Sequence, residues 1–314
     1  MNTLGISLLF KSCVCMRESV EISGTKYIVL ERIAVGGFSN IDLVESASTH
    51  RKYALKRITN HSKEDENNAL NEIEIIKKLS TTNITRIIDF SIEGSADDFH
   101  NQISHLNIVL PYYKNGSLDV YLNRKSKLND YISERQVLAL FSGICEGVRA
   151  IHEIGYAHRD LKTGNVCLSD SMEPVLVDFG SAAKARVEIN GQSEAMKLQD
   201  EAEEKCSMSY RAPELFQVDS YTIIDERVDI WSLGCVLYAL CYFQSPYDEV
   251  YLKGDSVPLA VLSGKISFPE SSPYSETMKE LILFLLKINP VERPYIYTVI
   301  EKTQDYIKKL EDYV

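Results

Sequence analysis

The chain has 314 residues, of which 45% are hydrophobic and 25% charged, with 15 glycines and 9 prolines. This composition excludes a collagenous, low-complexity or wholly disordered chain, and at about 150 residues per domain the length predicts two domains or one domain with two lobes. Lys and Arg number 34 against 45 Asp and Glu, which gives a net charge of −11. Phosphate backbones repel such an acidic chain, so nucleic acid is not an expected partner.

Cysteine usage and the N-terminal residues predict an intracellular protein. The seven cysteines are odd in number and scattered, without a CxxC pair, so neither a disulfide scaffold nor a zinc module is expected. The apolar run from Leu4 to Phe10 is short and follows no basic stretch. We therefore predict neither a membrane span nor a signal peptide.

The first third of the chain predicts a small β-rich lobe. Short alternating apolar runs, separated by turn residues, predict three antiparallel strands at 27–30, 41–44 and 53–58. Helical spacing follows at 63–79, and two more strand-like runs, 84–90 and 106–110, precede a connector at 111–116.

The remainder of the chain predicts a larger helical lobe. Ser133 and Gln136 form a capping box before an apolar stripe, and Gly155 marks the expected end of that helix. Further helices are expected at 229–242, 257–262, 276–287 and 296–310. The predicted fold class is therefore α+β, with a β-rich lobe beside an α-rich one.

A loop of small residues lies between the first two predicted strands, with the sequence Ala34-Val35-Gly36-Gly37-Phe38-Ser39. Its backbone amides can approach phosphates closely. A plain hairpin turn with two glycines explains most such loops, and the parallel strand context of a dinucleotide fold is absent. Alone, the loop is weak evidence for nucleotide binding.

Motifs that follow in a fixed order carry more weight. Lys56 ends the third strand, and Glu72 lies on the next helix, where a pair of the two would aim the ammonium at nucleotide phosphates. By itself Lys56 could also be a surface lysine. Three further motifs are His158-Arg159-Asp160-Leu161-Lys162-Thr163-Gly164-Asn165, Asp178-Phe179-Gly180 and Ala212-Pro213-Glu214. This ordered set is the protein-kinase signature.

Phosphoryl transfer explains the residue types in these motifs, because the reaction needs positioning and charge compensation more than covalent help. Asp160 would accept the proton of the incoming hydroxyl, and Lys162 would compensate charge on the transferred group. Asn165 and Asp178 are hard oxygen ligands suited to Mg²⁺, with Mn²⁺ as an alternative, on the phosphates of ATP.

The predicted ATP site combines the loop amides with an apolar sandwich around the adenine. Leu110 is the expected gatekeeper, and the Pro111 carbonyl and Tyr113 amide are the expected hinge contacts. The remaining apolar contacts are expected from Ile33, Ile41, Ala54 and Cys167. Core packing alone would also explain each of these apolar residues.

Three residues are predicted as structural supports. Asp229, in a buried helix, would brace the catalytic loop, and Glu214 would pair with Arg293.

On these motifs the sequence resembles a eukaryotic protein kinase from about Cys13 to the C-terminus. The resemblance implies a bilobal kinase fold, with an N-terminal segment at 1–22 and a kinase domain at 23–312. Within that domain it implies an N-lobe at about 23–113 and a C-lobe at about 114–312. A Lys at 162 is typical of serine/threonine kinases, and Ser207 matches the position whose hydroxyl contacts the catalytic Asp and Lys in that class.

More narrowly, the sequence resembles the myristoylated and palmitoylated serine/threonine kinase subfamily of the numb-associated kinase group. The matching segments are 35–39, 53–58, 155–162, 209–216 and 224–227. Members carry a helical insertion late in the activation segment, which implies a helix from Ser193 to Lys205 with Ser193 as N-cap and Glu194 in the first turn. Constitutive activity is implied with it. A solvated acidic linker is the alternative for this segment.

The subfamily resides at the Golgi and other intracellular membranes through N-terminal acylation, and Cys13 and Cys15 occupy the place of its palmitoylated pair. Residue 2 is Asn, where myristoylation needs Gly. The resemblance thus implies either an anchor of palmitate alone or a different start, and ordinary exposed thiols are the alternative. It also implies a role in secretory or endocytic traffic, on the cytoplasmic face of membranes or otherwise in the cytoplasm.

Other departures from the family pattern delete no catalytic group. Ala34 and Ser39 replace loop glycines, Thr163 replaces a usual proline, and Cys167 replaces a bulkier floor residue, which would enlarge the adenine pocket. The expected partners are ATP and protein substrates, including the chain itself. A pseudokinase scaffold, a dual-specificity kinase and a lipid-anchored adaptor are the competing interpretations, and the sequence does not predict an oligomeric state.

Overall fold

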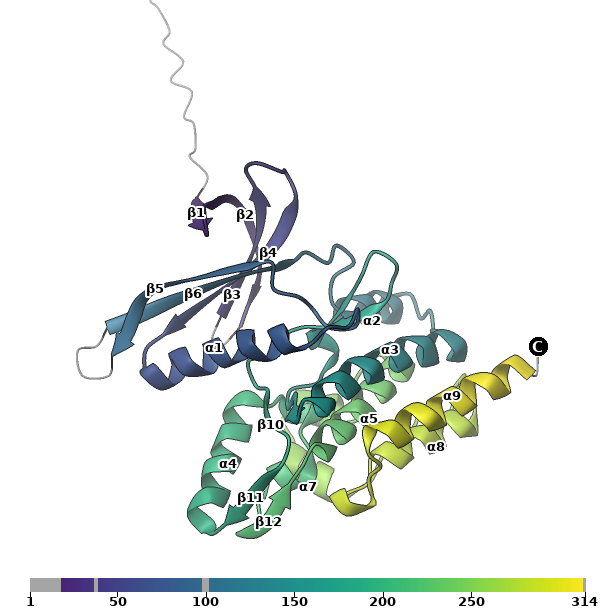
Figure 1. Ribbon diagram of the computed structural model, residues 1–314. Helices are drawn as coiled ribbons and strands as arrows, with labels where there is room; N and C mark the ends of the chain where they lie inside the picture. The colour runs from purple at the N-terminus through teal and green to yellow at the C-terminus, as the bar shows by residue number, and fades with distance from the viewer. Residues whose placement is uncertain (1–17, 37–38, 98–101, 313–314) are drawn as a thin grey trace, which may run out of the picture. The chain divides into compact units, whose positions relative to one another are not determined.

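The computed structural model describes residues 18–36, 39–97 and 102–312, and the chain forms two compact units. The first unit combines residues up to Lys63 with Ile88–Tyr112, and the second combines Glu64–Ile87 with Tyr113 onward. Strands make up the first unit and helices dominate the second (Figure 1), so the predicted α+β class is confirmed. Within the described residues, no helix combines the length and apolar character needed to cross a membrane.

The first unit is a six-stranded antiparallel sheet in the order β1-β2-β3-β4-β6-β5. Its strands are β1 (Ser19–Ile22), β2 (Thr25–Val35), β3 (Ser39–Ser46), β4 (Lys52–Asn60), β5 (Asp89–Asp97) and β6 (Gln102–Pro111). One face packs into a small core of Ile22, Tyr27, Val44, Leu55 and Val109. The three strands predicted at 27–30, 41–44 and 53–58 are confirmed as the centres of β2, β3 and β4.

Strand β1 was not predicted, and a tight turn explains how it forms. Ser23 and Gly24 join β1 to β2 with φ angles of 46° and 80°, the left-handed geometry that two-residue hairpins favour. The Ser23 hydroxyl donates a hydrogen bond to Asp89 Oδ1 at 2.8 Å. This bond joins the start of the sheet to β5, the strand at its opposite edge.

The strand predicted at 84–90 is wrong over most of its length, because β5 begins at Asp89. The preceding residues pair with the second unit instead: Leu176 donates its amide to Asn83 O at 2.8 Å, and Thr85 donates to Leu176 O at 2.9 Å. Ile84 is buried in the core of that unit. The alternating apolar residues therefore pack into the core of the second unit, and not into the core of the sheet as a strand would.

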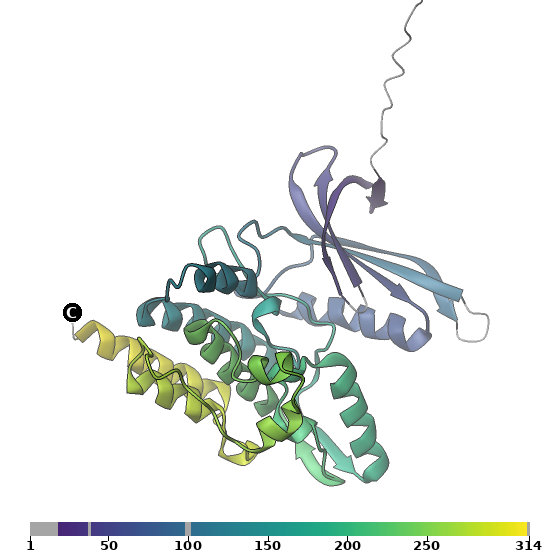
Figure 2. The same cartoon turned by 180° about the vertical axis from the view of Figure 1, so that it is seen from behind.

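The second unit contains the helices α1 (Lys63–Lys78), α2 (Leu118–Lys127), α3 (Glu134–Glu153), α4 (Gln192–Lys205), α5 (Arg227–Tyr242), α6 (Asp248–Leu252), α7 (Val257–Leu262), α8 (Glu276–Leu285) and α9 (Ile296–Asp312). Helix α5 is buried along almost its whole length, and α3, α8 and α9 lie beside one another around it (Figures 1 and 2). The helices predicted at 229–242, 257–262, 276–287 and 296–310 are confirmed, with ends that shift by up to two residues.

Short strand pairs complete the second unit. They are β8 (Val166–Leu168) with β9 (Pro174–Leu176), β7 (Tyr156–Ala157) with β10 (Ala183–Lys184), and β11 (Val187–Asn190) with β12 (Tyr221–Ile224). Each pair is antiparallel. Strands β7 and β8 flank the motif at 158–165, and strands β9 and β10 flank the motif at 178–180.

Helix α3 forms as predicted. The Ser133 hydroxyl accepts a hydrogen bond from the Gln136 amide at 3.4 Å, and Gly155 adopts a φ of 77° just after the helix. Of its predicted apolar stripe, Leu140 is half-buried and the rest are fully buried: Val137, Phe141, Ile144, Val148 and Ile151. Burial of this stripe makes α3 a rigid support for the loop that follows it.

The boundary between the compact units differs from the contiguous split predicted near residue 113. Helix α1 groups with the helical unit, because Ile75 and Ile76 belong to its large core. The Lys78 ammonium also lies 5.4 Å from the centre of the Tyr156 ring. Chain order alone does not reveal which core an amphipathic helix joins.

Helix α4 is present where the insertion was expected, but its predicted N-cap is wrong. The helix begins at Gln192 with Gly191 as N-cap, so Ser193 lies inside the first turn. Glu194 lies in that turn as predicted, and its carboxylate accepts a hydrogen bond from the Asn190 amide at 2.8 Å. Glu194 thus reaches back to the backbone before the helix, as the third-position residue of a capping box does, and leaves the first-turn amides without a side-chain cap.

Candidate active site

A buried carboxylate on α5, that of Asp229, holds the start of the catalytic loop at 158–165. Asp229 Oδ2 accepts hydrogen bonds from the His158 amide at 2.7 Å and from His152 Nε2 at 2.9 Å, and Oδ1 accepts one from the Arg159 amide at 2.8 Å. Burial raises the pKa of Asp229, but the bonds from His152 and His158 outweigh it and lower the pKa below its usual value. Asp229 is therefore a charged brace for the loop backbone.

Two motif residues have a left-handed backbone. Arg159 has a φ of 64° and Asp178 a φ of 62°, a region that non-glycine residues adopt at an energetic cost. At Arg159 the bond to Asp229 holds this conformation, and the Arg159 guanidinium donates to Lys184 O at 3.1 Å. Strained backbone that surrounding contacts hold in place is typical of active sites.

Asp160 is the centre of a dense group of hydrogen bonds. Lys162 Nζ lies 2.8 Å from Asp160 Oδ2, and Asn165 Nδ2 donates to the same oxygen at 3.1 Å and to the Asp160 carbonyl at 2.9 Å. The Asp160 residue is only 8% exposed. A buried carboxylate with one lysine partner suits a proton acceptor beside a developing charge.

Ser207 contacts the same pair, though not entirely as the resemblance implied. Its hydroxyl accepts a hydrogen bond from Lys162 Nζ at 2.7 Å, while its backbone amide donates to Asp160 Oδ1 at 2.8 Å. The hydroxyl therefore contacts the lysine, and the amide contacts the aspartate. The segment that follows α4 is thereby brought directly against the catalytic loop.

Asp178 follows β9 with one residue between them, and the backbone of that residue bonds to the catalytic loop. The Val177 amide donates to Asn165 O at 2.9 Å, and the buried Phe179 ring lies 5.1 Å from the His158 ring. The two predicted metal ligands therefore emerge from adjacent backbone segments.

The donor set fits a magnesium ion bound to nucleotide phosphates. Magnesium is usually held by one or two carboxylate or amide oxygens, with phosphates and water supplying the rest. Both side-chain hydrogen bonds of Asn165 use its amide nitrogen, Nδ2. The side-chain oxygen, Oδ1, is therefore the atom suited to a cation. No cluster of three His, Cys, Asp or Glu side chains with metal-binding geometry occurs among the described residues.

In the first unit, five of the residues predicted around ATP share one face of the sheet. Ala34 pairs with Ile41, Ile41 with Lys56, and Ala54 with Leu110 across neighbouring strands. Directly paired residues point to the same side, as do residues two apart. Lys56, which is 5% exposed, thus lies in a row with the expected adenine contacts and the expected gatekeeper.

The loop before β3 and the end of β6 supply the other first-unit contacts. Gly36 donates its amide to Ser39 O at 2.7 Å, which closes the turn, and Ile33 and Val35 are exposed. Gly37 and Phe38 lie outside the described residues, as do the lipidation candidates Cys13 and Cys15. Pro111 ends β6 opposite Tyr53.

The second unit carries the remaining predicted contacts. Burial raises the pKa of Tyr113, and its hydroxyl donates to Thr85 Oγ1 at 3.4 Å. Burial also raises the pKa of the Cys167 thiol to about 12. Glu72 is 2% exposed on α1; its pairing with Lys56 would join the two units and stays a prediction.

Glu214 and Arg293 form the predicted pair. Arg293 donates to the two Glu214 oxygens at 2.8 and 2.5 Å and also to the carbonyls of Arg227, Lys287 and Ile288. Its guanidinium is fully buried and lies 5.4 Å from the centre of the Trp231 ring. Five donors with several acceptors make this a satisfied buried charge.

Two contributors to the site were missed from the sequence, His152 and Arg211. Arg211 donates to Cys206 O at 2.8 Å and Glu203 O at 3.3 Å, at the end of α4. His152 is 77 residues from its partner Asp229, and no local pattern marks such a contact. The neighbouring motif His158-Arg159-Asp160 was the one signal that pointed to this part of the chain.

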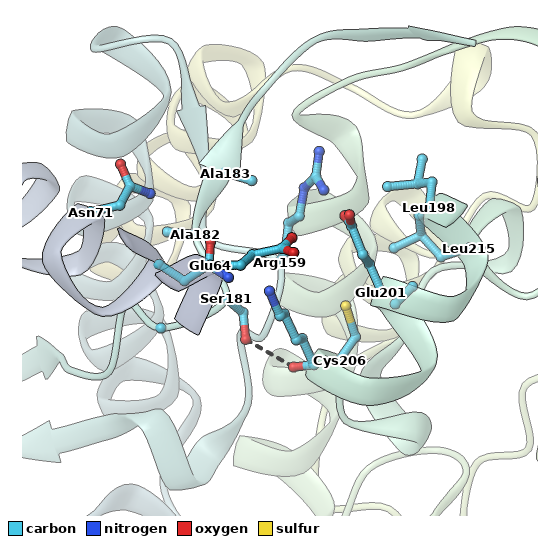
Figure 3. Close-up of a pocket in the computed structure, with 14 residues that line it drawn as sticks. Glu64, Asn71, Arg159, Ser181, Ala182, Ala183, Leu198, Glu201, Cys206 and Leu215 are labelled. Atoms are coloured by element: carbon cyan, nitrogen blue, oxygen red, sulfur yellow. Dashed lines mark hydrogen bonds between the residues drawn. The ribbon is translucent and has the colours of Figure 1, made fainter. Parts of the chain in front are cut away.

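A cavity of about 150 Å³ lies beside Arg159 and was not predicted. Figure 3 shows side chains of α1, α4 and the segment after Asp178 around it, with the Ser181 hydroxyl donating to Lys205 O at 2.9 Å. The lining balances the acids Glu64 and Glu201 against Arg159 and Lys205. Its mixed charge selects no particular ligand.

Comparison with known proteins agrees with this geometry. A family profile described as "Protein kinase domain" matches residues 27–304. Serine/threonine-protein kinase 16 of Rattus norvegicus is 40% identical over 93% of this chain and 94% of its own length. The Homo sapiens protein of that name is 40% identical over 90% and 91%. A probable serine/threonine-protein kinase of Dictyostelium discoideum is 30% identical over 94% and 98%.

These matches cover nearly the whole chain and confirm the resemblance drawn from the motifs. The chain belongs to the protein kinase family and is a serine/threonine-protein kinase.

Proposed function

We propose that this chain transfers the γ-phosphoryl group of ATP, bound with Mg²⁺, to serine and threonine hydroxyls of proteins, itself included. The hydrogen bonds around Asp160 carry this proposal. Lys162, Asn165 and Ser207 each bond to Asp160, and Lys162 also bonds to the Ser207 hydroxyl. A pseudokinase scaffold would not need this arrangement of charge and hydrogen bonds.

Each residue has a separate role in the proposed reaction. Asp160 accepts the hydrogen bond of the attacking hydroxyl and takes its proton as the oxygen bonds to the γ-phosphorus, while the bond from that phosphorus to the bridging oxygen breaks and ADP leaves. Lys162 compensates the charge on the transferred group. Asn165 and Asp178 would hold the metal, which would supply positive charge against the phosphates.

Helix α4 supports the proposal of activity without a separate activating event. Its last-turn carbonyls accept hydrogen bonds from Ser181, which follows Asp178, and from Arg211. Ser207, directly after the helix, contacts the catalytic pair. The segment is thus ordered through the folded chain's own contacts, in line with the constitutive activity that the family resemblance implies.

The decisive experiment measures transfer of labelled γ-phosphate from MgATP to the purified protein and to a serine- and threonine-containing peptide. Wild type should label both, and Asp160→Asn should label neither while still binding ATP. Asp170→Asn is the matched control, because that carboxylate is exposed in the turn between β8 and β9. A folded wild type that binds ATP without transfer would overturn the proposal in favour of a scaffold.

Phosphoamino-acid analysis of the same products tests the acceptor class. Phosphoserine and phosphothreonine are expected. Phosphotyrosine in amounts that depend on Asp160 would instead assign dual specificity.

We further propose membrane association through palmitate on Cys13 and Cys15, with a role in secretory or endocytic traffic at the Golgi or other membranes. The subfamily resemblance supports this proposal, and so do two cysteines separated by a single residue. Two lipid chains give stable anchoring where one does not. Palmitate labelling in cells should be lost in the Cys13→Ser/Cys15→Ser variant together with sedimentation in the membrane fraction. Cys167→Ser is the control, and membrane binding that survives loss of both N-terminal thiols would contradict the proposal.

A further inference from the structure

The Tyr113 side chain joins the connector at 111–116 to the segment that follows α1. Its hydroxyl donates a hydrogen bond to Thr85 Oγ1 at 3.4 Å, across 28 residues of sequence. Thr85 is only 2% exposed. Burial raises the pKa of Tyr113, and the bond to Thr85 opposes that rise. The two hydroxyls are therefore a neutral pair in a largely buried place.

Thr85 has a fixed backbone position beside β9. Its amide donates to Leu176 O at 2.9 Å, and the Leu176 amide donates to Asn83 O at 2.8 Å. The Asn83 side chain adds a bond from Nδ2 to Pro174 O at 2.9 Å. Segment 83–85 thus pairs in parallel with β9, and it cannot shift without breaking these three bonds.

The connector is held on β8 in the same unit. Tyr113 is the first connector residue that groups with the second unit. Its carbonyl accepts a hydrogen bond from the Gly116 amide at 3.0 Å, and Gly116 O accepts one from the Leu168 amide at 2.9 Å. Ser117 then pairs with Cys167 in an isolated antiparallel bridge. The backbone that follows Tyr113 is therefore fixed to β8.

The bond between the two hydroxyls closes a ring of hydrogen-bonded segments. The connector bonds to β8, β8 pairs with β9, β9 pairs with segment 83–85, and Thr85 returns to the connector at Tyr113. Cys167, the predicted floor of the adenine site, lies on the β8 part of this ring. Without the hydroxyl bond the ring is open at Tyr113, the residue whose amide is the expected adenine contact. The place of that amide relative to Cys167 is then set from one side only.

We propose that Thr85 and Tyr113 are positioning residues for the adenine of ATP, because their hydroxyl bond holds the Tyr113 amide where the adenine requires it. This inference rests on the proposed use of ATP. A donor that is held in place before binding gives a higher affinity, since less freedom is lost when the ligand binds. The ring includes neither Asp160 nor the predicted metal ligands, so the effect is confined to the adenine.

Three single variants and one double variant test the hydroxyl bond. Tyr113→Phe and Thr85→Val each remove it while nearly keeping the size of the side chain, and Thr85→Ser keeps the hydroxyl. Each of the first two changes leaves one hydroxyl without its partner. The double variant Thr85→Val/Tyr113→Phe removes the same bond only once, so its effect should not exceed that of either single change.

Two matched controls lose a hydroxyl bond elsewhere in the second unit. Tyr238→Phe loses a 2.7 Å bond to Ser267 O, and Thr303→Val loses a 2.7 Å bond to Val299 O in α9. The readouts are the thermal unfolding midpoint, the calorimetric Kd of MgATP and of adenosine, and the KM for ATP and for a serine peptide.

We expect Tyr113→Phe and Thr85→Val to raise the Kd of MgATP and of adenosine by the same factor, about two- to fivefold, the loss typical of one hydrogen bond. The ATP KM should rise with them, the peptide KM should stay unchanged, and Thr85→Ser should match wild type. The inference is overturned if both variants bind MgATP as tightly as the two controls do. It is also overturned if the Kd of MgATP rises while that of adenosine does not.

Failure of the proposed function gives a different result. A wild type that binds MgATP but transfers no phosphate would refute phosphoryl transfer, while the Kd values would still test the role of Thr85 and Tyr113. A folded wild type that does not bind MgATP would refute both.

Discussion

Asp229 accepts the amide hydrogen of Arg159 at 2.8 Å, and this bond holds Arg159 in a left-handed backbone with a φ of 64°. The residue that follows is Asp160, the proposed proton acceptor. A carboxylate on the most buried helix therefore sets the conformation of the loop at the residue where the backbone is strained.

We expect Asp229→Asn to lower kcat by about ten- to a hundredfold, because each hydrogen bond to a charged group contributes about 1.5–3 kcal/mol. An amide of the same size keeps only part of this bonding and disturbs the position of Asp160. Steady-state kinetics with MgATP and peptide measures the effect, with Asp170→Asn as the exposed control. An unchanged kcat in the folded variant would show that the loop keeps its conformation without Asp229.

The pair of Glu214 and Arg293 is expected to contribute strongly to the stability of the helical unit where the start of α5 meets the segment after α8. Glu214→Gln leaves the fully buried Arg293 guanidinium without its charged partner, and such a loss costs about 3–5 kcal/mol. Urea unfolding measures the change in unfolding free energy. The exposed pair of Lys253 and Glu249 is the control, and a Glu249→Gln variant should unfold as wild type does.

Stability should fall in acid through Asp225. Burial raises the pKa of Asp225, but its bonds to Arg227 outweigh burial and lower the pKa below the usual value. A lowered carboxyl pKa in the folded state stabilises the protein above the unfolded-state pKa of about 3.9, and this contribution is lost as pH falls through the folded value.

The thermal midpoints of wild type and Asp225→Asn should therefore differ most at neutral pH. They should converge as the pH falls below about 4. A difference that stays constant from pH 7 to pH 3 would mean that the carboxylate charge of Asp225 does not contribute.

The thiols of Cys167 and Cys206 should react slowly with iodoacetamide at pH 8. Burial raises both pKa values to about 12, so almost no thiolate is present at that pH. Mass spectrometry of tryptic peptides after brief labelling checks this, with the chain unfolded in guanidinium as control. Rapid native labelling at Cys167 would mean that the floor of the predicted adenine site is more polar than the structure indicates.

The sequence predicted which residues lie together around Asp160, because a short motif encodes them locally. Asp160, Lys162 and Asn165 lie within a few residues of one another, so their spacing alone constrains them to one loop. The support from Asp229 was also predictable, since its motif is specific. Contacts that no motif marks were not predictable in the same way, as the bond from His152 to Asp229 shows.

The errors have physical causes of the same kind. The apolar residues at 84–88 alternate as in a strand, yet they fill the core beside β9. Ser193 has the right side chain for an N-cap, but the backbone of β11 reaches the helix at Gly191 with a φ of 144°, so the cap falls earlier. In both cases tertiary packing decided between options that local propensity left close in energy.

The hydrogen bonds at the end of α4 also have an entropic consequence. Ser181 and Arg211 bond to carbonyls at the end of α4, so one bond closes a loop from 181 to 205 and the other closes a short loop from 203 to 211. Both loops depend on the end of α4, so unwinding that end opens both and gains more conformational entropy than one local break. Amide hydrogens along α4 and the turn at 208–210 should therefore exchange with solvent as one cooperative unit, with a shared opening free energy.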